Sequence, residues 1–586
     1  MPKDFIENFI NSLQGKTTKV YLIFANIILI IFAIWFSNVG LLPFSNAGDF
    51  LFFTVLALIL AVYRPGWAFV LFIGALALEN INLAPENFGL AVRPYQFFGA
   101  LTIVALIVQI AMKRLPFSLP KFKWYDVLLI VFVFGGFLSS IGAVNKTVSL
   151  KQSVIALSFV ALYFLTRVYV QSLNDLKRIA PFFLSGAIIV AFYGILQNIL
   201  FIHGGNSFEV MPGRPNGTFA EADWLGIFLV FILAVIFTII YYFNRKTTAV
   251  ISNDQFPISN NQKIKKHITH ATLYMLLILT FVSLILTVSR SSWLGAVLVS
   301  IGFFKIMLTN GSLRMSQWDW NKFLRELRNL TAVVILSLIL IYVFHLTNFQ
   351  IFNRAKSVDG LQKITVACER ESNSPKKELD SQSVIGNVSE LAQYGCRHIN
   401  LEDIEKEKAV GNNISEIYRT DPNINIRSEI YQKSITQIRQ NPIMGIGWGN
   451  INAILGTDER PARIATSLNE NGKTYNSENQ STEGANQTQQ SVAGGGAGFN
   501  ASNIFLEAWL GAGLVGILSF IILLGYIFVR GTLMLLDRKT EDKTTTAFIL
   551  LGWAAIVIPN LFNSGIFLGF VWVYLAIAIS LIEAKE

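Results

Sequence analysis

Long runs of apolar residues alternate with short polar loops along most of this chain. Runs of about 17–25 apolar residues are long enough for an α-helix to cross a bilayer, and their number here predicts about 12–14 transmembrane helices. The sequence therefore predicts an all-α polytopic membrane protein. The predicted spans lie near residues 20–37, 50–63, 66–80, 96–112, 126–143, 152–170, 179–201, 224–243, 271–289, 291–308, 332–349, 503–529, 546–562 and 565–583.

One polar segment is much longer than the other loops and interrupts the apolar pattern late in the chain. It covers residues 350–502 and separates an N-terminal bundle (1–349) from the C-terminal helices (503–586). Within it, residues 468–500 are rich in Asn, Ser, Thr, Gln and Gly, a composition that predicts disorder.

An earlier part of this loop has the periodicity of a helix. Isoleucines recur there near helical spacing, and an Asn-Pro pair follows them, which predicts a helix that ends at this pair. The residues concerned are Ile426, Ile430, Ile435, Ile438, Asn441 and Pro442.

The composition supports the membrane interpretation. Of 586 residues, 53% are hydrophobic and only 14% are charged, with a mean hydropathy of +0.50, whereas soluble domains carry about 25% charged residues. The formal net charge is +10, but the basic residues cluster in loops between apolar spans. Helix orientation and anionic lipid headgroups explain them better than nucleic acid does.

The basic residues are unequally divided between alternate loops. One set of loops contains most of them, and the opposite set of short loops contains little beyond Arg93, Lys146, Arg214 and Arg290. By the positive-inside rule, both termini are expected in the cytoplasm and the large loop outside. A polar lead of nineteen residues without a small-residue cleavage site precedes the first span. We therefore expect that span to be retained rather than removed as a signal peptide.

Both cysteines of the chain, Cys368 and Cys396, lie in the large loop. In an oxidising outer compartment they could form a disulfide that closes a modest loop. Two unpaired thiols are the alternative.

Several classes of chemistry have no support in the sequence. The five histidines and two cysteines lack the spacing of a zinc site. A Walker-type glycine-rich loop and a serine-hydrolase elbow are also absent. We therefore expect no metal and no nucleotide cofactor.

Three arginines, Arg214, Arg290 and Arg427, map to the predicted outer face, where basic residues are otherwise scarce. Cations at the mouth of an apolar bundle suggest a site for an anionic, lipid-linked substrate such as a pyrophosphate, because a guanidinium can bind phosphate oxygens in a bidentate manner. Each has a simpler alternative. Arg214 could pair with Glu221 or Asp223, Arg290 could extend to the membrane interface, and Arg427 could be a solvated helix charge.

Four segments in order resemble the O-antigen ligase and O-antigen polymerase superfamily of bacterial envelopes. The resemblance covers roughly residues 70–583, including Glu79 and the turn at Arg93-Pro94-Tyr95. The four segments are 213–226 (GRPNGTFAEADWLG), 286–295 (LTVSRSSWLG), 427–450 (R-x3-Y followed by NPIMGIGWGN) and 502–516 (SNIFLEAWLGAGLVG).

This resemblance implies a GT-C-type glycosyltransferase that needs neither metal nor nucleotide. Such enzymes sit in the bacterial cytoplasmic membrane. They transfer a glycan from a polyprenyl-pyrophosphate-linked donor, undecaprenyl pyrophosphate in this family, to a glycan, lipid or protein acceptor at the outer face. By analogy, Arg214 and Arg427 match the positions that hold the pyrophosphate, and Arg290 and Arg93 are further candidates for the same cluster. Substrate contacts are also expected from the motif residues Asn216, Thr218, Ser502 and Asn503.

The sequence departs from the family pattern at one position. Ligases usually have His-Asn at the start of the span after the large loop, where this chain has Ser502-Asn503. A serine cannot act as a neutral base near pH 7 as an imidazole can, which argues against a standard lipid A-core ligase. Three explanations stay open: a base from the loop (His398), a carboxylate, or transfer without a strong base. The candidate carboxylates are Glu221, Asp223 and Glu507.

Two other functions compete with the enzyme. A transporter for lipid-linked glycans would be expected to have two similar halves with broken helices, and the sequence shows no such halves. An inactive relative that binds polysaccharide is the second alternative, because the family histidine is missing. The concentration of arginines on one face favours the enzyme.

Overall fold

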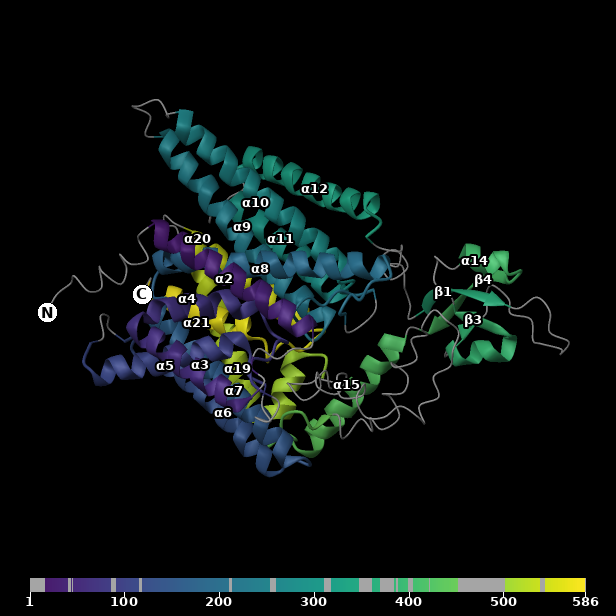
Figure 1. Ribbon diagram of the computed structural model, residues 1–586, viewed down its shortest axis with the longest axis horizontal. Coiled ribbons are helices and arrows are strands. Elements are labelled where there is room, and N and C mark those ends of the chain that lie inside the picture. The colour runs from purple at the N-terminus through teal and green to yellow at the C-terminus, as the bar shows by residue number, and fades with distance from the viewer. Residues whose placement is uncertain are drawn as a thin grey trace.

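The computed structural model of this chain is a bundle of long helices with a small sheet-containing domain at one end (Figure 1). Of the helices described, ten are long and apolar enough to cross a membrane, one bent pair could form a further span, and α20 and α21 are shorter apolar helices. The structure describes residues 16–39, 44, 46–85, 91–114, 119–209, 213–252, 260–309, 318–346, 361–368, 384–385, 388–398, 404–420, 422–451, 501–537 and 543–584.

The bundle consists of α2 (Lys16–Asn38), α3 (Ala47–Tyr63), α4 (Pro65–Gly74) with the short helix η1 (Ala75–Ala77), α5 (Pro94–Ala111), α6 (Trp124–Ile141), α7 (Lys146–Tyr169), α8 (Leu173–Ile202), α9 (Ala222–Ser252), α10 (Asn260–Leu286), α11 (Arg290–Thr309), α12 (Trp320–Val343), α19 (Ile504–Leu536), α20 (Thr544–Asn560) and α21 (Gly569–Glu583). The large loop contributes β1 (Leu361–Cys368), β2 (Val384–Ile385), η4 (Val388–Tyr394), β3 (Cys396–His398), α14 (Ile404–Ala409), β4 (Asn413–Thr420) and α15 (Pro422–Gln440).

A helix occupies each predicted span, so the prediction of a polytopic helical membrane protein is confirmed. Several spans differ in detail. The segments 50–63 and 66–80 form a pair bent by 115°, and ten residues of α4 rise only about 15 Å, half a bilayer core. The span placed at 332–349 begins at Trp320 instead, because the charged first turns of α12 masked its helical start.

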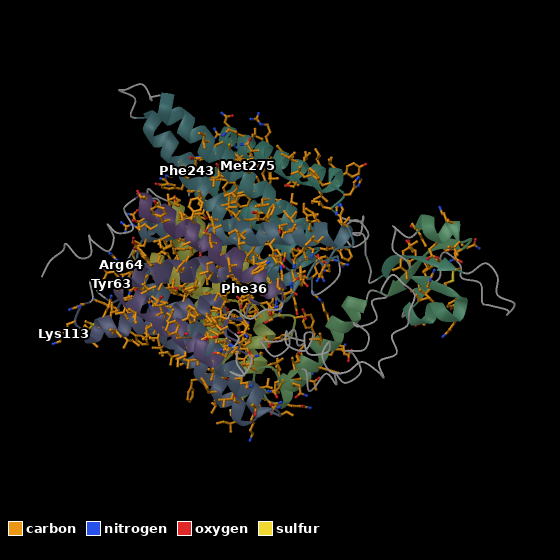
Figure 2. All side chains as sticks on the ribbon, viewed as in Figure 1. Phe36, Tyr63, Arg64, Lys113, Phe243 and Met275 are labelled. Carbon is orange, nitrogen blue, oxygen red and sulfur yellow. A yellow bond between two sulfur atoms is a disulfide. The ribbon has the colours of Figure 1, made fainter. Side chains whose placement is uncertain are left out.

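The two ends of the bundle differ in the segments that they carry. Helix α2 begins and α21 ends at one end, and Figure 2 shows Tyr63, Arg64 and Lys113 there as well. The turns that precede α5, α9, α11 and α19 lie at the opposite end, which also carries the loop domain. We call this opposite end the arginine face, because Arg93, Arg214, Arg290 and Arg427 are on these turns and on α15. Which face meets the cytoplasm stays a prediction.

The large loop contains a four-stranded sheet with the order β2-β4-β1-β3. Strand β1 is antiparallel to both β3 and β4, while β2 is parallel to β4. The sequence analysis expected a helical and a disordered part in this loop and did not predict the sheet. The strands have at most eight residues, and an apolar alternation this short is easily overlooked beside long apolar runs.

Cys368 and Cys396 lie directly opposite each other on β1 and β3 and form a disulfide, with Cα atoms 4.0 Å apart. Residues 468–500, for which disorder is expected, and the first fifteen residues of the polar lead lie outside the described part of the chain.

Helix α15 ends at Gln440, directly before the Asn-Pro pair, which confirms the helix predicted there. Ile430 and Ile438 of this helix are buried against Ala501 and Leu510. Ile435 is 42% exposed, so it does not share their buried face.

Transmembrane helix α19 is broken near its start. Gly513 has φ 68° and ψ −171°, which is incompatible with a helix. The backbone groups that this break leaves open bond to the segment 441–450 after α15, as backbone groups in an apolar environment require. The N–H groups of Ile446 and Gly447 donate to the Leu510 carbonyl at 2.8 and 3.1 Å, and Leu514 N–H donates to the Ile443 carbonyl at 2.9 Å.

An indole ring fixes the same segment inside the bundle. Trp448 is 1% exposed and packs between the rings of Phe132 and Phe567, with centroid distances of 5.8 and 5.1 Å. The indole lies over Gly511, where an added Cβ would meet it at 2.0 Å. The absence of a side chain at Gly511 thus allows the close approach of the indole. Gly513 is needed instead because its backbone is left-handed.

We predict that Gly513→Ala destabilises the protein by more than about 2 kcal/mol, because φ there is left-handed and the new methyl would overlap the Ile443 carbonyl. That oxygen lies 2.2 Å from the ideal Cβ position. Thermal unfolding of the detergent-solubilised protein, followed by tryptophan fluorescence, measures the effect. Gly525→Ala in the same helix is the control, because nothing lies within 4 Å of its Cβ position. Equal losses in both variants would contradict the prediction.

Candidate active site

Helix α15 brings Arg427 to the arginine face. The helix is held on the bundle by its buried isoleucines and by Trp509, whose indole N–H donates to the Pro442 carbonyl at 2.8 Å. Arg427 is partly buried. Within the described part of the chain its guanidinium has no hydrogen bond and no ion pair, and its charge acts on Glu221.

Arg214 joins the start of α9 to the turn between α10 and α11. Its Nη2 lies 3.2 Å from Oδ1 of Asp223, and its Nε donates to the Thr287 carbonyl at 3.3 Å. The side chains of Arg214 and Asp223 are 17% and 21% exposed. The ion pair considered as an alternative for Arg214 is therefore present, at a site that solvent still reaches.

Glu221 directly precedes α9 and interacts electrostatically with Arg214 and Arg427. The pKa of Glu221 is raised to about 7, mainly by burial and also by the charge of Asp223, while the charges of Arg214 and Arg427 lower it. Within the described residues, the Glu221 carboxylate accepts no hydrogen bond. Such a group changes its charge near neutral pH, which suits a proton acceptor.

Two expected substrate contacts instead hold the backbone of the loop at 213–219. The Asn216 amide donates to the Phe219 carbonyl at 2.5 Å, and the Thr218 hydroxyl donates to the Ala77 carbonyl. Gly217 N–H donates to the Gln197 side chain at 2.7 Å. These bonds fix the loop from which Arg214 extends.

Arg290 is exposed and begins α11. The hydroxyls around it bond to one another, with Ser289 Oγ 2.9 Å from Ser292 Oγ. Asn563, in the turn between α20 and α21, donates from Nδ2 to Ser291 Oγ at 2.7 Å. The Arg290 turn is thus connected to the turn between α20 and α21.

Ser502 lies in a turn with a left-handed φ of 50°. The Tyr431 hydroxyl donates to the Ser502 carbonyl at 3.1 Å. Asn503 caps α19 by accepting from Phe505 N–H at 2.9 Å, and its amide donates to the Leu561 carbonyl at 2.9 Å.

Glu507 is 7% exposed, and its Oε2 accepts from the Ala501 N–H at 2.7 Å. This carboxylate supports the turn at Ser502.

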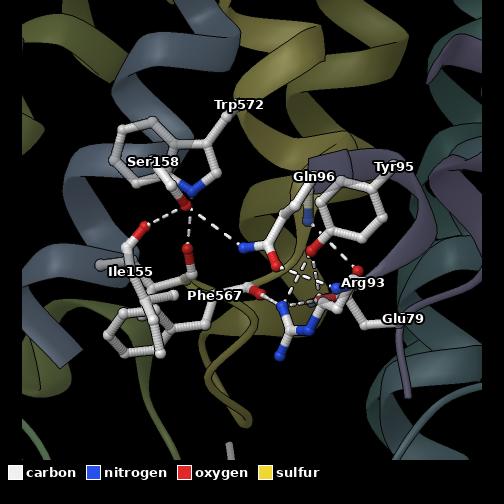
Figure 3. Close-up of polar contacts among 10 residues, drawn as sticks. Glu79, Arg93, Tyr95, Gln96, Ile155, Ser158, Phe567 and Trp572 are labelled. Atoms are coloured by element: carbon white, nitrogen blue, oxygen red, sulfur yellow. Dashed lines mark hydrogen bonds and ion pairs between the residues drawn. The ribbon is translucent and has the colours of Figure 1, made fainter. Parts of the chain in front are cut away.

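Arg93 forms a buried network with Glu79, as Figure 3 shows. Its Nη1 donates to Glu79 Oε1, to the Tyr95 hydroxyl at 2.8 Å and to the Phe567 carbonyl at 3.1 Å. Gly569 N–H approaches the other Glu79 oxygen at 3.4 Å. In this position Arg93 holds the turn 561–568 between α20 and α21, which also contacts the Ser291 and Asn503 turns.

The structure therefore groups the sequence candidates in two ways. Arg214, Glu221, Asp223 and Arg427 interact through their charges, and the turns of Arg93, Arg290 and Asn503 meet at the turn 561–568. Asn563, which lies in that turn, was not among the residues that the sequence motifs indicated. The side chain of His398 lies outside the described part of the chain.

Sequence reasoning also missed Glu209, a carboxyl beside the Arg214 loop. Its Oε2 accepts from Gly213 N–H at 2.9 Å. Burial raises the pKa of Glu209 to about 7, although the Gly213 N–H and the Ser207 hydroxyl lower it. The sequence contains one indication of this residue, an acidic side chain between the apolar residues Phe208 and Val210. Among the described residues, no three His, Cys, Asp or Glu side chains are grouped as metal ligands would be.

The comparison with known proteins supports the family indicated by the sequence motifs. Residues 275–521 match the model of the O-antigen ligase family. No curated protein and no solved structure matches the chain. The matched segment begins in α10, contains Arg290, α15 and Ser502, and ends in α19 beyond its break. This match covers less than half of the chain and supports the O-antigen ligase and polymerase superfamily that the motifs indicate.

Proposed function

We propose that this protein is a GT-C-type glycosyltransferase that moves a glycan from a polyprenyl-pyrophosphate donor to a hydroxyl of a glycan, lipid or protein acceptor. The family match supports an activity of the ligase or polymerase type. The observation that carries the finer proposal is the grouping of Arg214 and Arg427 with Glu221, whose pKa lies near 7. The active face is the arginine face, which the charge asymmetry of the loops assigns to the outside of the cytoplasmic membrane.

The arginines are suited to the leaving group. Arg427 has no hydrogen bond or ion pair in the described part of the chain, and the pair between Arg214 and Asp223 is partly exposed at 3.2 Å. A pyrophosphate carries more charge than one carboxylate, so it competes well for both guanidinium groups. Arg290 is exposed and lies three residues after Thr287, whose carbonyl accepts from Arg214, so it adds a third cation to this surface.

Glu221 supplies the base in this proposal. The acceptor hydroxyl oxygen forms a bond to the anomeric carbon, and the bond from that carbon to the pyrophosphate oxygen breaks. The hydroxyl proton passes to Glu221, and polyprenyl pyrophosphate leaves with the bonding electrons. Arg214 and Arg427 stabilise the charge that develops on it.

The other two carboxylates are less suited to this role. Asp223 is paired with Arg214 at 3.2 Å, and Glu507 is bonded to the Ala501 backbone at 2.7 Å. A proton acceptor must be able to approach the substrate hydroxyl. Glu221, which accepts no hydrogen bond from the described residues, meets this condition best.

The direct test is glycan transfer by the purified protein without added metal or nucleotide. A polyprenyl-pyrophosphate oligosaccharide is supplied alone and then with candidate acceptors. Elongation of the donor alone would identify a polymerase, and transfer only to an added lipid or protein would identify a ligase. Saturable donor binding without any transfer would contradict the proposal and favour a transporter or an inactive relative.

We expect Arg427→Ala to lower the transfer rate about 10²–10³-fold, the usual loss when one donor to a developing charge is removed. Arg214→Ala should behave similarly, and Arg→Lys should restore little because lysine lacks the bidentate geometry. Arg439→Ala is the matched control, because Arg439 is exposed on the same helix, α15. Full transfer by both Arg214→Ala and Arg427→Ala would exclude a role in pyrophosphate binding.

The transfer rate should rise with pH through a midpoint near 7, because Glu221 accepts a proton only when it is ionised and its pKa is raised to about 7. Glu221→Gln should lower the rate about 10²–10⁴-fold and remove this midpoint. Asp223→Asn should move the midpoint to lower pH, because it removes a neighbouring negative charge that raises the pKa of Glu221. Rates at saturating donor across the pH range measure both effects. An unchanged midpoint in Glu221→Gln would assign the base elsewhere.

A further inference from the structure

A second polar cluster lies at the opposite end of the bundle, where α9 leaves the bundle and α12 begins. Its centre is Glu326, which is 4% exposed. Asn244 of α9 donates to Glu326 Oε1 at 3.3 Å, and the Tyr274 hydroxyl of α10 donates to Oε2 at 2.7 Å. Arg325 Nε also donates to Oε1 at 3.3 Å. Three helices thus meet at one buried carboxylate.

Cations outnumber the anions in this cluster. Arg245 follows Asn244, and the charges of Arg245 and Arg325 both act on Lys322. On the negative side are Glu326 and Asp319, whose carboxylate caps α12 by accepting from the Lys322 N–H at 3.0 Å. The positive end of the α12 dipole lies at the same place, so the local charge is positive.

One donor of this cluster lacks a partner. Nη1 of Arg245 is buried, and within the described part of the chain it has no hydrogen bond. The whole Arg245 side chain has no ion pair there either. Buried charged donors are normally paired. Neighbouring Lys322 and Arg325 are also cations, so the partner that Arg245 Nη1 lacks among the described residues is an anion.

Aromatic side chains place the cluster at the depth of lipid headgroups. Trp318 and Trp320 lie at the start of α12 with ring centroids 5.8 Å apart, and Trp320 packs edge-on against Phe323 at 5.7 Å. Trp320 is 51% exposed. Exposed tryptophans at helix ends mark the interface between hydrocarbon and headgroups.

We propose that Arg245 and Lys322 form a binding site for the phosphate of an anionic lipid headgroup, between α9, α10 and α12. The phosphate oxygens would accept from Arg245 Nη1 and Lys322 Nζ, while Glu326 and Tyr274 hold the three helices together beneath it. Basic pockets between transmembrane helices commonly take such headgroups. This site is separate from the arginine face and does not depend on the proposed transferase activity.

The orientation of basic loops does not by itself explain this arrangement. The positive-inside rule requires only that cations lie on one side of the membrane, and a solvated side chain would satisfy it. Arg328, exposed on the same helix as Lys322, is such a side chain. Arg245 differs because its Nη1 is buried and unpaired, which indicates a specific acceptor.

The test is the thermal unfolding midpoint of the full-length protein in phosphatidylcholine vesicles, with and without added phosphatidylglycerol. We expect phosphatidylglycerol to raise the midpoint of the wild-type protein and of Arg328→Gln. Arg245→Gln should need at least about fivefold more anionic lipid for the same rise, because one basic residue near an anionic surface contributes a factor of this order. An identical lipid response in Arg245→Gln and the wild-type protein would overturn the proposal.

A second series of vesicles identifies the source of the phosphate. Inorganic phosphate is titrated into the protein in phosphatidylcholine alone. A rise in the midpoint that Arg245→Gln loses would assign the same site to soluble phosphate, and no rise would assign it to the lipid. If Arg245→Gln does not reconstitute, Lys322→Gln decides in the same assay: a wild-type lipid response from that variant would overturn the proposal.

Discussion

The arginine face depends on the hydrogen bonds between the broken helix α19 and the segment after α15. Leu510 and Leu514 would leave buried backbone groups unpaired if residues 443–447 moved away, and each such group costs several kcal/mol in an apolar environment. This requirement fixes α15 on the bundle. The position of Arg427 beside Glu221, and of Tyr431 on the Ser502 turn, follows from it. A backbone constraint inside the membrane therefore organises charges at its surface.

The polar clusters around Arg93 and around Glu221 differ in how completely their charges are paired. Around Arg93, the guanidinium is matched by Glu79, a hydroxyl and a carbonyl, so it serves as a fixed anchor. Around Glu221, two cations and two carboxylates interact through their charges, and Arg214 pairs directly with Asp223. Buried charges that are left partly unmatched suit a change of protonation or the arrival of a ligand. This contrast separates a structural arginine from functional candidates of the same residue type.

The sequence predicted what depends on long apolar runs or on local helix signals, including the spans and α15. The sequence did not predict features that depend on tertiary contacts. The bend after Tyr63 and the break at Gly513 interrupt segments that are apolar throughout, so hydropathy does not register them. The sheet was missed because its strands are short. The side chains of Asn216 and Thr218, expected as substrate contacts, bond to backbone carbonyls in the fold; a role in substrate binding stays a prediction.

The shape of the turn at Ser502 depends on neighbouring side chains. The turn at this position is held on its carbonyl by Tyr431, on the preceding N–H by Glu507 and on its far side by Asn503. Such supports preserve the geometry of the turn whatever side chain it carries. In the proposed mechanism the proton acceptor comes from another element at the same face. Glu221, whose pKa is raised to about 7 just before α9, is the residue proposed for that role.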